Sequence, residues 1–281
     1  MSTSFGHFGQ LIRVWNLFPY TRRLGMWFAD VTRFSVEHTG LSLLNTRSCV
    51  IFLMQGKLNW RQFFQSAAFC GIDALGLALV MTTFTGMVIA LQMAQEMVKQ
   101  GAGNFVGALM SLSMLRELAP IMTGFSIIAM VGSAYAAELA SMKISNQVDA
   151  LQVLHVNPIR YLLLPRVLAL MVMLPLMTVI TSFSGIMGGL FISSTFTNLS
   201  AHVYLDSVLH QTEMRDVFSC LLKSLVFGYL IGIISTTIGL NTSGGAKQAG
   251  IATTQAVVWS FIMMAVFDYL ITYFIYGSSG Q

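Results

Sequence analysis

Charged residues are scarce in this sequence. Of its 281 residues only 9% are Asp, Glu, Lys or Arg, whereas 55% are hydrophobic and the mean hydropathy is +0.72. A soluble domain carries about 25% charged residues. The chain therefore lacks the polar surface of a water-soluble globule, and its composition predicts a membrane protein. The formal net charge is +4. The sequence has no soluble domain that could support a basic arm, which argues against nucleic-acid binding.

The sequence also lacks the patterns that mark enzymes and metal sites. It has no H-E-x-x-H, G-x-S-x-G or P-loop motif, and its five histidines are scattered. The cysteines Cys49, Cys70 and Cys220 have no C-x-x-C spacing, which predicts neither a disulfide nor a metal ligand. Residues 244–247 could cradle a phosphate, but they lack the flanking strand and helix of a phosphate-binding loop. We expect no catalytic residue, no metal and no cofactor on this chain.

Residues 1–66 contain no run of about 20 apolar residues, the length that spans a membrane. Aromatic residues such as Trp15, Trp27 and Trp60 alternate there with arginines. This composition is typical of amphipathic helices that lie in the membrane interface, and a solvated cytoplasmic tail is the alternative. The first long apolar run begins near Ala67, which is too far into the chain for a cleavable signal peptide.

Residues 67–281 hold five long apolar segments, which predict an all-α membrane protein with about five transmembrane helices. The second segment is too long for one straight crossing and contains Pro120, so we expect a tilted or broken helix there. Pro165 and Pro175 predict that the third segment is interrupted. The predicted spans are Ala67–Ala94, Phe105–Leu139, Tyr161–Phe196, Val217–Leu240 and Ile251–Tyr276.

The distribution of charge gives these spans an orientation. Seven of the fifteen Lys and Arg precede residue 62, which places the N-terminus in the cytoplasm. Lys143, Arg160 and Arg166 then fall on a cytoplasmic loop or its edges, and the acidic segment Thr197–Asp216 falls outside as a polar loop. With five spans, the C-terminus also lies outside.

Residues 141–157 form the one extended polar stretch in the middle of the chain. Apolar residues there, including Val148 and Leu151, are three or four positions apart, which predicts an amphipathic helix. Asn157 precedes Pro158 and ends this helix, because the residue before a proline is pushed out of the α region.

Five ionisable residues lie within the predicted spans: Asp73, Arg116, Glu117, Lys223 and Asp268. Charges at membrane depth cost roughly 2.5 to 3.5 kcal/mol each on insertion scales, so they are functional candidates. Arg116 and Glu117 lie about 100° apart on a helix and need different partners. We expect Glu117 to pair with Lys223 and Arg116 with Asp268, with the reverse pairing left open. The network either only fixes helix packing or also meets a charged headgroup.

Several motifs in the same region resemble the signature of the MlaE/YrbE permeases, and the resemblance covers about residues 67–275. These permeases are the membrane subunits of ABC transporters that work with MCE proteins on phospholipids and other lipids. The motifs are Leu115–Pro120, Gly132–Ala134, Ala136–Glu138, Gln147–Leu151, Asn157–Tyr161 and Pro165–Arg166, followed by Lys223, Asp268 and their neighbours.

The resemblance implies a subunit of the bacterial inner membrane that forms a homodimer, with a lipid pocket between the two copies. It also implies that a coupling helix at about 141–157 docks into a separate ATPase subunit, which binds ATP and Mg²⁺. Arg116, Glu117, Lys223, Asp268 and Gln92 then belong to the charge network and lipid pocket. Glycines such as Gly86, Gly185, Gly188 and Gly189 offer close-approach faces for the second copy. The residues implied in coupling are Glu138, Lys143, Gln147, Asp149, Leu151 and Arg160.

The chain departs from the family pattern at Met130 and Gln255, where the family usually has arginine, and more mildly at Ala119 and Asn146. Two other function classes are alternatives to the ABC permease. A secondary transporter would commonly show inverted repeats with paired broken spans, and none is visible. A structural membrane subunit would need no transport partner, so co-purification of an ATPase separates it from the permease.

Overall fold

The computed structural model describes residue 45 and residues 59–196 and 199–277. The described part of the chain is helical and contains no strand. Five of its helices are long and apolar enough to cross a membrane, which confirms the expected number of spans. Most of the expected interfacial region, residues 1–66, lies outside the described residues. The five spans are Trp60–Lys99, Gly103–Ile144, Ile159–Phe196, Met214–Leu240 and Ala246–Tyr276.

The first span is one continuous helical rod, built from α2 (Trp60–Ala68), the π-helical turn η1 (Phe69–Asp73) and α3 (Ala74–Lys99). It begins seven residues before the expected start at Ala67. No proline interrupts residues 60–73, so the amphipathic segment joins the apolar segment without a break. In a membrane a continuous helix also satisfies every backbone hydrogen bond within the segment.

The second span is likewise unbroken, although it contains Pro120. After η2 (Gly103–Phe105) it runs through α4 (Val106–Ser113), η3 (Met114–Leu118), α5 (Ala119–Ile127), η4 (Ile128–Gly132) and α6 (Ser133–Ile144). The π-helical turn η3 directly precedes Pro120, which stands in the first turn of α5. The backbone remains helical on both sides of this proline, because the π-helical turn changes the hydrogen-bond pattern just before the residue that has no N–H. The second span is therefore not broken at Pro120, and the tilted helix that we expected as the alternative stays a prediction.

The third span combines η5 (Ile159–Leu163) with α8 (Leu164–Phe196), which continues through Pro175. The expected interruptions at Pro165 and Pro175 are also wrong, because α8 is helical on both sides of each. The fourth and fifth spans are α10 (Met214–Leu240) and α11 (Ala246–Tyr276). Much of the segment expected as a polar loop, Thr197–Asp216, is the helix α9 (Ala201–Gln211).

Tyr204 holds α9 against the bundle. Its side chain is fully buried, and its hydroxyl donates a hydrogen bond to the carbonyl of Ile186 at 3.2 Å. A Cβ on Gly107 of α4 would come within 2.2 Å of the Tyr204 carbonyl oxygen, so the two helices touch through backbone. Burial raises the pKa of the Tyr204 hydroxyl, which therefore remains a donor.

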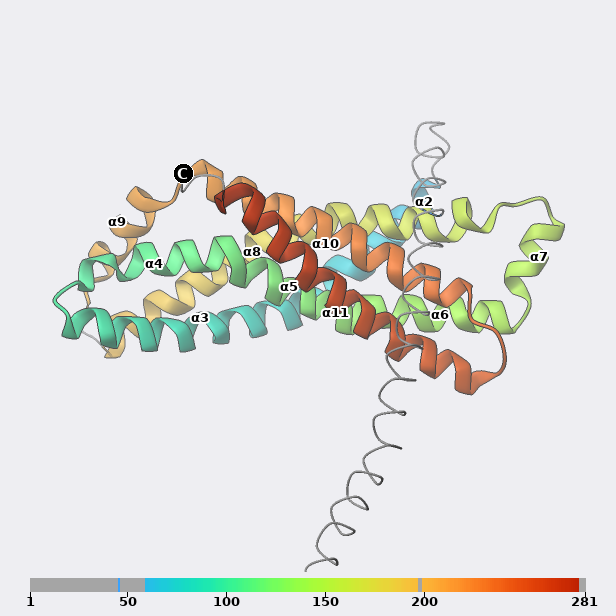
Figure 1. Ribbon diagram of the computed structural model, residues 1–281, viewed down its shortest axis with the longest axis horizontal. Coiled ribbons are helices and arrows are strands. Elements are labelled where there is room, and N and C mark those ends of the chain that lie inside the picture. The colour runs from blue at the N-terminus through green and yellow to red at the C-terminus, as the bar shows by residue number, and fades with distance from the viewer. Residues whose placement is uncertain (1–44, 46–58, 197–198, 278–281) are drawn as a thin grey trace, which may run out of the picture. The chain divides into compact units, whose positions relative to one another are not determined.

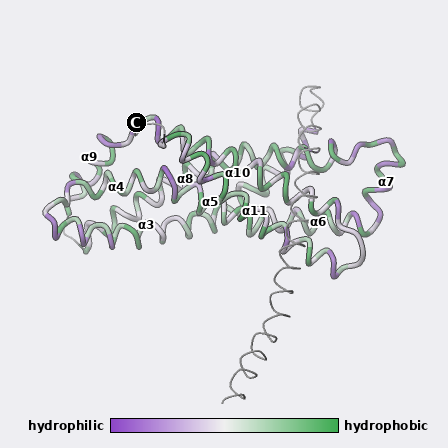
Figure 2. The backbone as a smooth tube through the Cα atoms, viewed as in Figure 1, coloured by the Kyte–Doolittle hydropathy of each residue, from purple (hydrophilic) through white to green (hydrophobic). Residues whose placement is uncertain are grey.

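The spans alternate in direction, so the connections collect at two ends. The short helix α7 (Gln147–Val153) and the turn between α10 and α11 lie at one end, and α9 and the end of α11 lie at the other (Figure 1). Figure 2 shows hydrophilic residues gathered towards these ends, with hydrophobic residues along the spans between them. This arrangement fits the order of connections that the sequence predicts.

The glycines of α3 and α8 pack against each other within the chain. A Cβ on Gly86 would lie 2.3 Å from the carbonyl oxygen of Gly185, and a Cβ on Gly188 would lie 3.0 Å from that of Thr83. A Cβ on Gly189 would lie 2.8 Å from the hydroxyl of Tyr204. These glycines let two spans of one chain approach closely. The expectation that they form faces for a second copy is wrong.

Candidate functional site

Lys223 is the centre of a buried charge cluster. Its side chain, on α10, is fully buried, and its Nζ lies 2.7 Å from Glu117 Oε2 and 2.8 Å from Asp268 Oδ1. Glu117 comes from η3 and Asp268 from α11, so three spans meet at this one ammonium group. The expected contact between Glu117 and Lys223 is present. Asp268, which we expected to pair with Arg116, instead joins the same lysine.

Two further contacts fix Lys223 and Glu117. Lys223 Nζ donates a hydrogen bond to the backbone carbonyl of Arg116 at 2.8 Å. Thr272 of α11, one turn after Asp268, donates to Glu117 Oε1 at 2.9 Å. Both oxygens of Glu117 thus have partners. A buried ammonium needs this many acceptors, because an uncompensated buried charge costs several kcal/mol.

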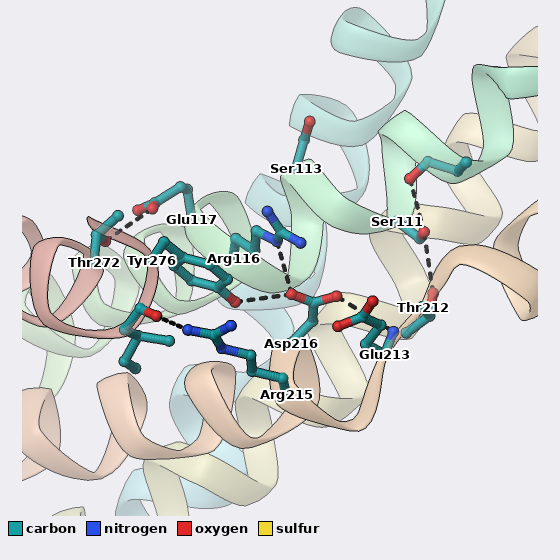
Figure 3. Close-up of polar contacts among 12 residues, drawn as sticks. Ser111, Ser113, Arg116, Glu117, Thr212, Glu213, Arg215, Asp216, Thr272 and Tyr276 are labelled. Atoms are coloured by element: carbon teal, nitrogen blue, oxygen red, sulfur yellow. Dashed lines mark hydrogen bonds and ion pairs between the residues drawn. The ribbon is translucent and has the colours of Figure 1, made fainter. Parts of the chain in front are cut away.

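The side chain of Arg116 forms a second pair, with Asp216. Arg116 Nε lies 2.7 Å from Asp216 Oδ1, and Tyr276 donates its hydroxyl to the same oxygen at 2.8 Å (Figure 3). The guanidinium also lies over the Tyr276 ring, 4.4 Å from its centroid, which is a favourable cation–π distance. The expected pairing of Arg116 with Asp268 is therefore wrong.

Asp216 is a site residue that we expected in a loop. It is fully buried in the first turn of α10, where its Oδ2 accepts from the backbone N–H of Glu213 at 3.3 Å. The side chain of Glu213 accepts from the backbone in return, so the two residues form a capping box. An acid three residues after another acid, just before an apolar run, is the signal that would have identified this helix start.

The cluster has a buried side and an open side. Lys223 and Asp216 are fully buried, whereas the side chains of Arg116 and Glu117 are each 36% exposed. Two cations and three carboxylates make up its core, and Arg215 adds a third cation at the rim. Arg215 lies 5.4 Å from the Tyr276 ring centroid and donates to the carbonyl of Ile275. A charged group outside the chain can approach from the side of Arg116 and Glu117.

Gln92 and Asp73 do not join this cluster. Gln92 is exposed on α3, and Asp73 is exposed in η1. None of the contacts of Lys223, Glu117, Arg116 or Asp216 described above involves either residue. The grouping of Gln92 with the charge network stays a prediction that would require a second chain or a ligand to bring them together.

The segment expected as one amphipathic helix at 141–157 is divided. Residues 141–144 complete α6, a turn follows, and α7 contains only seven residues. Asn146 stands in the turn with a left-handed backbone, φ 58°, a conformation that asparagine adopts more readily than most residues. Asn146, one of the positions at which the chain departs from the family pattern, thus lies in the turn that separates α6 from α7.

The apolar face of α7 packs on its own chain. Val148 is buried with Leu139 and Leu162, and Leu151 packs against them. Asp149 pairs with Lys143 at 2.6 Å. Val148 was expected to bury in a cleft of a partner, but its own chain covers it. Docking of Leu151 and Asp149, which are only partly buried, stays a prediction. Val153 and Leu154, at this end, are 78% and 70% exposed.

The remaining candidate coupling residues flank the same end. Glu138 of α6 pairs with Arg166 of α8 at 2.7 Å. Gln147 is exposed at the start of α7, and Arg160 is half-buried in η5. Among the residues that the structure describes, no group of three or more His, Cys, Asp or Glu side chains could hold a metal ion. The absence of a cofactor stays a prediction.

A family model described as "Permease MlaE" matches residues 63–274, which overlap all five spans and include the five charged residues at the core of the cluster. The chain belongs to the MlaE permease family. A probable ABC transporter permease protein of Synechocystis sp. is 40% identical over 236 residues, which are 84% of this chain and 90% of that protein. A probable ABC transporter permease protein of Rickettsia typhi is 40% identical over 204 residues, 73% of this chain and 79% of that protein.

A plant protein is also similar to this chain. The protein trigalactosyldiacylglycerol 1, chloroplastic, of Arabidopsis thaliana is 35% identical over 232 residues. The match covers 83% of this chain and 66% of that protein. Together with the five spans, these similarities make this MlaE-family chain a multi-pass membrane protein and a permease subunit of an ABC transporter, a class that works with an ATPase partner.

Proposed function

We propose that this permease moves a lipid, specifically a phospholipid, between the bacterial inner membrane and the cell envelope. The observation that carries the proposal is the charge cluster around Lys223, which is buried among spans and open at Arg116 and Glu117. Lipids combine a charged headgroup with apolar chains, so they suit a charged site among membrane spans. The Arabidopsis relative, which bears the name of a glycolipid, supports a lipid substrate.

The ATPase docks at the end of the bundle that carries α7. Exposed Val153 and Leu154 form an apolar tip there, and apolar side chains that protrude into water are typical of binding surfaces. The ion pair between Lys143 of α6 and Asp149 of α7 stabilises the turn between these two helices. ATP and Mg²⁺ bind to the partner, and movement of the partner reaches the spans through α6 and α8, which the turn joins.

The functional unit is a homodimer with an MCE protein. Each chain has one α7 to engage one ATPase, and the family resemblance implies that ATP sites form between two ATPase subunits. An apolar row on α3, Val80, Phe84 and Val88, is about half exposed and offers a surface for the second copy or for lipid. The end with α9 is opposite α7 (Figure 1), so an MCE protein outside the membrane meets the chain there, with the N-terminus in the cytoplasm.

The test is purification of the chain with its associated proteins, followed by mass spectrometry of bound lipids and an ATP-dependent transfer assay to an MCE protein. We expect an ATPase to co-purify and phospholipid to move only when ATP is hydrolysed. Transfer that follows an ion gradient without ATP would support a secondary transporter. Absence of an ATPase and of any lipid movement would leave only a structural subunit.

A further inference from the structure

A cavity of about 450 Å³ lies between α2, α6 and the start of α8, away from the Lys223 cluster. Ligand sites commonly have volumes of 300 to 1,000 Å³. Its walls carry an unusual amount of polarity for a membrane span, since Gln62, Gln65, Glu138 and Arg166 all line it. Tyr135 and Tyr161 complete the polar part of the wall. None of these residues touches the charge cluster described above.

Two opposite charges face this cavity. The guanidinium of Arg166 is mostly buried, with 11% of the side chain exposed, and one of its nitrogens, Nη2, pairs with Glu138 Oε1. Arg166 Cζ also lies 5.1 Å from the centroid of the Tyr135 ring. Glu138 is 56% exposed, so its carboxylate can pair with a second cation. The cavity thus has a positive wall and a negative wall side by side.

One buried donor and one buried acceptor lie unpaired in the walls. Within the described residues, neither Arg166 Nη1 nor Gln62 Oε1 has a hydrogen-bond partner. Leaving a buried polar group unsatisfied costs about 1 to 3 kcal/mol. The two side chains require complementary partners, because the guanidinium can only donate and the amide oxygen can only accept. A ligand that satisfies both must carry an acceptor for Arg166 and a donor for Gln62, and the charges of Arg166 and Glu138 favour an anionic acceptor and a cationic donor.

The depth of the cavity in the membrane indicates the source of such a ligand. Gln62, Gln65, Ser66 and Phe69 recur at helical spacing and line the cavity. Trp60 and Phe64, on another face of α2, are 62% and 63% exposed. Exposed aromatic side chains at the end of a span are typical of the headgroup region. Phospholipid headgroups are therefore the groups present at this depth.

We infer that this cavity binds a zwitterionic membrane phospholipid whose headgroup carries a phosphate and a primary ammonium. The phosphate lies against Arg166, and the ammonium lies between Glu138 and Gln62. The inference uses the membrane placement of the chain and does not depend on which substrate is transported. Its site is lined by α2, α6 and α8, whereas the proposed transport site is built on η3, α10 and α11.

The test is photocrosslinking from a residue in the cavity wall. The full-length chain carries p-benzoylphenylalanine in place of Tyr161 and is placed in lipid discs with equal amounts of phosphatidylethanolamine, phosphatidylglycerol and diacylglycerol. The matched control carries the same group in place of Tyr273, which is 59% exposed on α11 and remote from the cavity. Mass spectrometry then identifies the attached lipid. We expect phosphatidylethanolamine to exceed each other lipid at least fivefold at position 161 and to match the mixture at position 273.

Two variants test the assigned contacts. Glu138→Gln keeps a hydrogen-bond acceptor for Arg166 but removes the negative charge, so capture at position 161 should change in favour of phosphatidylglycerol. Gln62→Leu removes the side-chain amide, including this acceptor, and leaves Glu138 and Arg166 in place. It should lower the capture of phosphatidylethanolamine at least threefold, which keeps the test decisive if the first variant does not fold. Equal lipid ratios at positions 161 and 273, a cavity that captures no lipid, or unchanged ratios in a folded variant would each overturn the inference.

The transport site gives an independent comparison. A chain with Glu117→Gln, Lys223→Met and Asp268→Asn should lose ATP-dependent lipid transfer if the proposed function is right, yet it should keep the headgroup selectivity at position 161. Loss of transfer with retained selectivity supports both conclusions. Selectivity that disappears in this folded variant would contradict the separation of the two sites.

Discussion

Lys223 donates a hydrogen bond to the backbone carbonyl of Arg116 at 2.8 Å. In an α-helix that carbonyl would accept from the N–H four residues later, but the residue there is Pro120, which has no N–H. The proline thus removes the α-helical donor for this carbonyl in the middle of a span, and a lysine from another span donates to it. The same short segment also supplies Glu117, so Pro120 and η3 together shape the site around Lys223.

Replacing Pro120 with alanine should weaken this arrangement without harming the helix. The new N–H competes with Lys223 for the Arg116 carbonyl, and loss of one hydrogen bond of about 1 kcal/mol corresponds to roughly a fivefold lower transfer rate. Stability should not fall, since proline costs about 3 kcal/mol inside a helix. The matched control is Pro175→Ala in α8. Lipid transfer and thermal unfolding are measured for both, and a wild-type transfer rate in Pro120→Ala would contradict this role.

The charge cluster predicts which combinations of substitutions restore folding. Lys223→Met leaves Glu117 and Asp268 without their shared cation, which should destabilise the protein by about 3 to 5 kcal/mol. Adding Glu117→Gln alone is insufficient, because Asp268 remains unpaired. The triple variant with Asp268→Asn has no unpaired charge at this centre and should regain most of the stability.

Assembly and transport are measured on that same series. If the cluster only fixes helix packing, the triple variant transports lipid as well as the native chain. If it also meets the headgroup, the triple variant folds and binds the ATPase but moves at least tenfold less lipid. Full transport by the triple variant would contradict a role of the cluster in lipid transport.

Leu154 is the residue whose change should separate the permease from its ATPase. It is 70% exposed next to α7, so Leu154→Asp should leave the fold intact and remove an apolar contact with the partner. Leu209→Asp is the control, because Leu209 is 78% exposed on α9 at the opposite end. We expect ATPase co-purification to fall at least tenfold only for Leu154→Asp. Equal recovery with both variants would contradict docking at this end.

Gly86 tests the packing of α3 on α8. A methyl group there would meet the Gly185 carbonyl oxygen, so Gly86→Ala should destabilise the chain by about 1 to 3 kcal/mol through overpacking. Gly76→Ala on the same helix is the control, since a Cβ at this position would have no neighbour within 4 Å, and alanine favours a helix by up to about 1 kcal/mol. Thermal unfolding of the purified chains should show opposite changes. A neutral Gly86→Ala would argue against the tight contact.

The sequence by itself determined the membrane class and the five spans. It also identified Glu117 and Lys223 as candidate partners, with the reverse pairing left open. Span length and hydropathy are local properties, and a membrane requires each segment to satisfy its own backbone hydrogen bonds. Helix continuity was less predictable. Prolines at 120, 165 and 175 signal breaks by their own chemistry, but the π-helical turn before Pro120 and the packing around α8 keep both spans helical.

Only the tertiary structure decided the remaining contacts. Charge sign could not choose between Asp216 and Asp268 as the partner of Arg116, because both are acids on distant segments and only the positions of α10 and α11 distinguish them. Likewise, the pattern around Val148 showed that one face is apolar but not that its own chain covers it. Spacing and charge indicate which kind of partner a side chain requires, whereas the packing of the helices decides which residue is that partner.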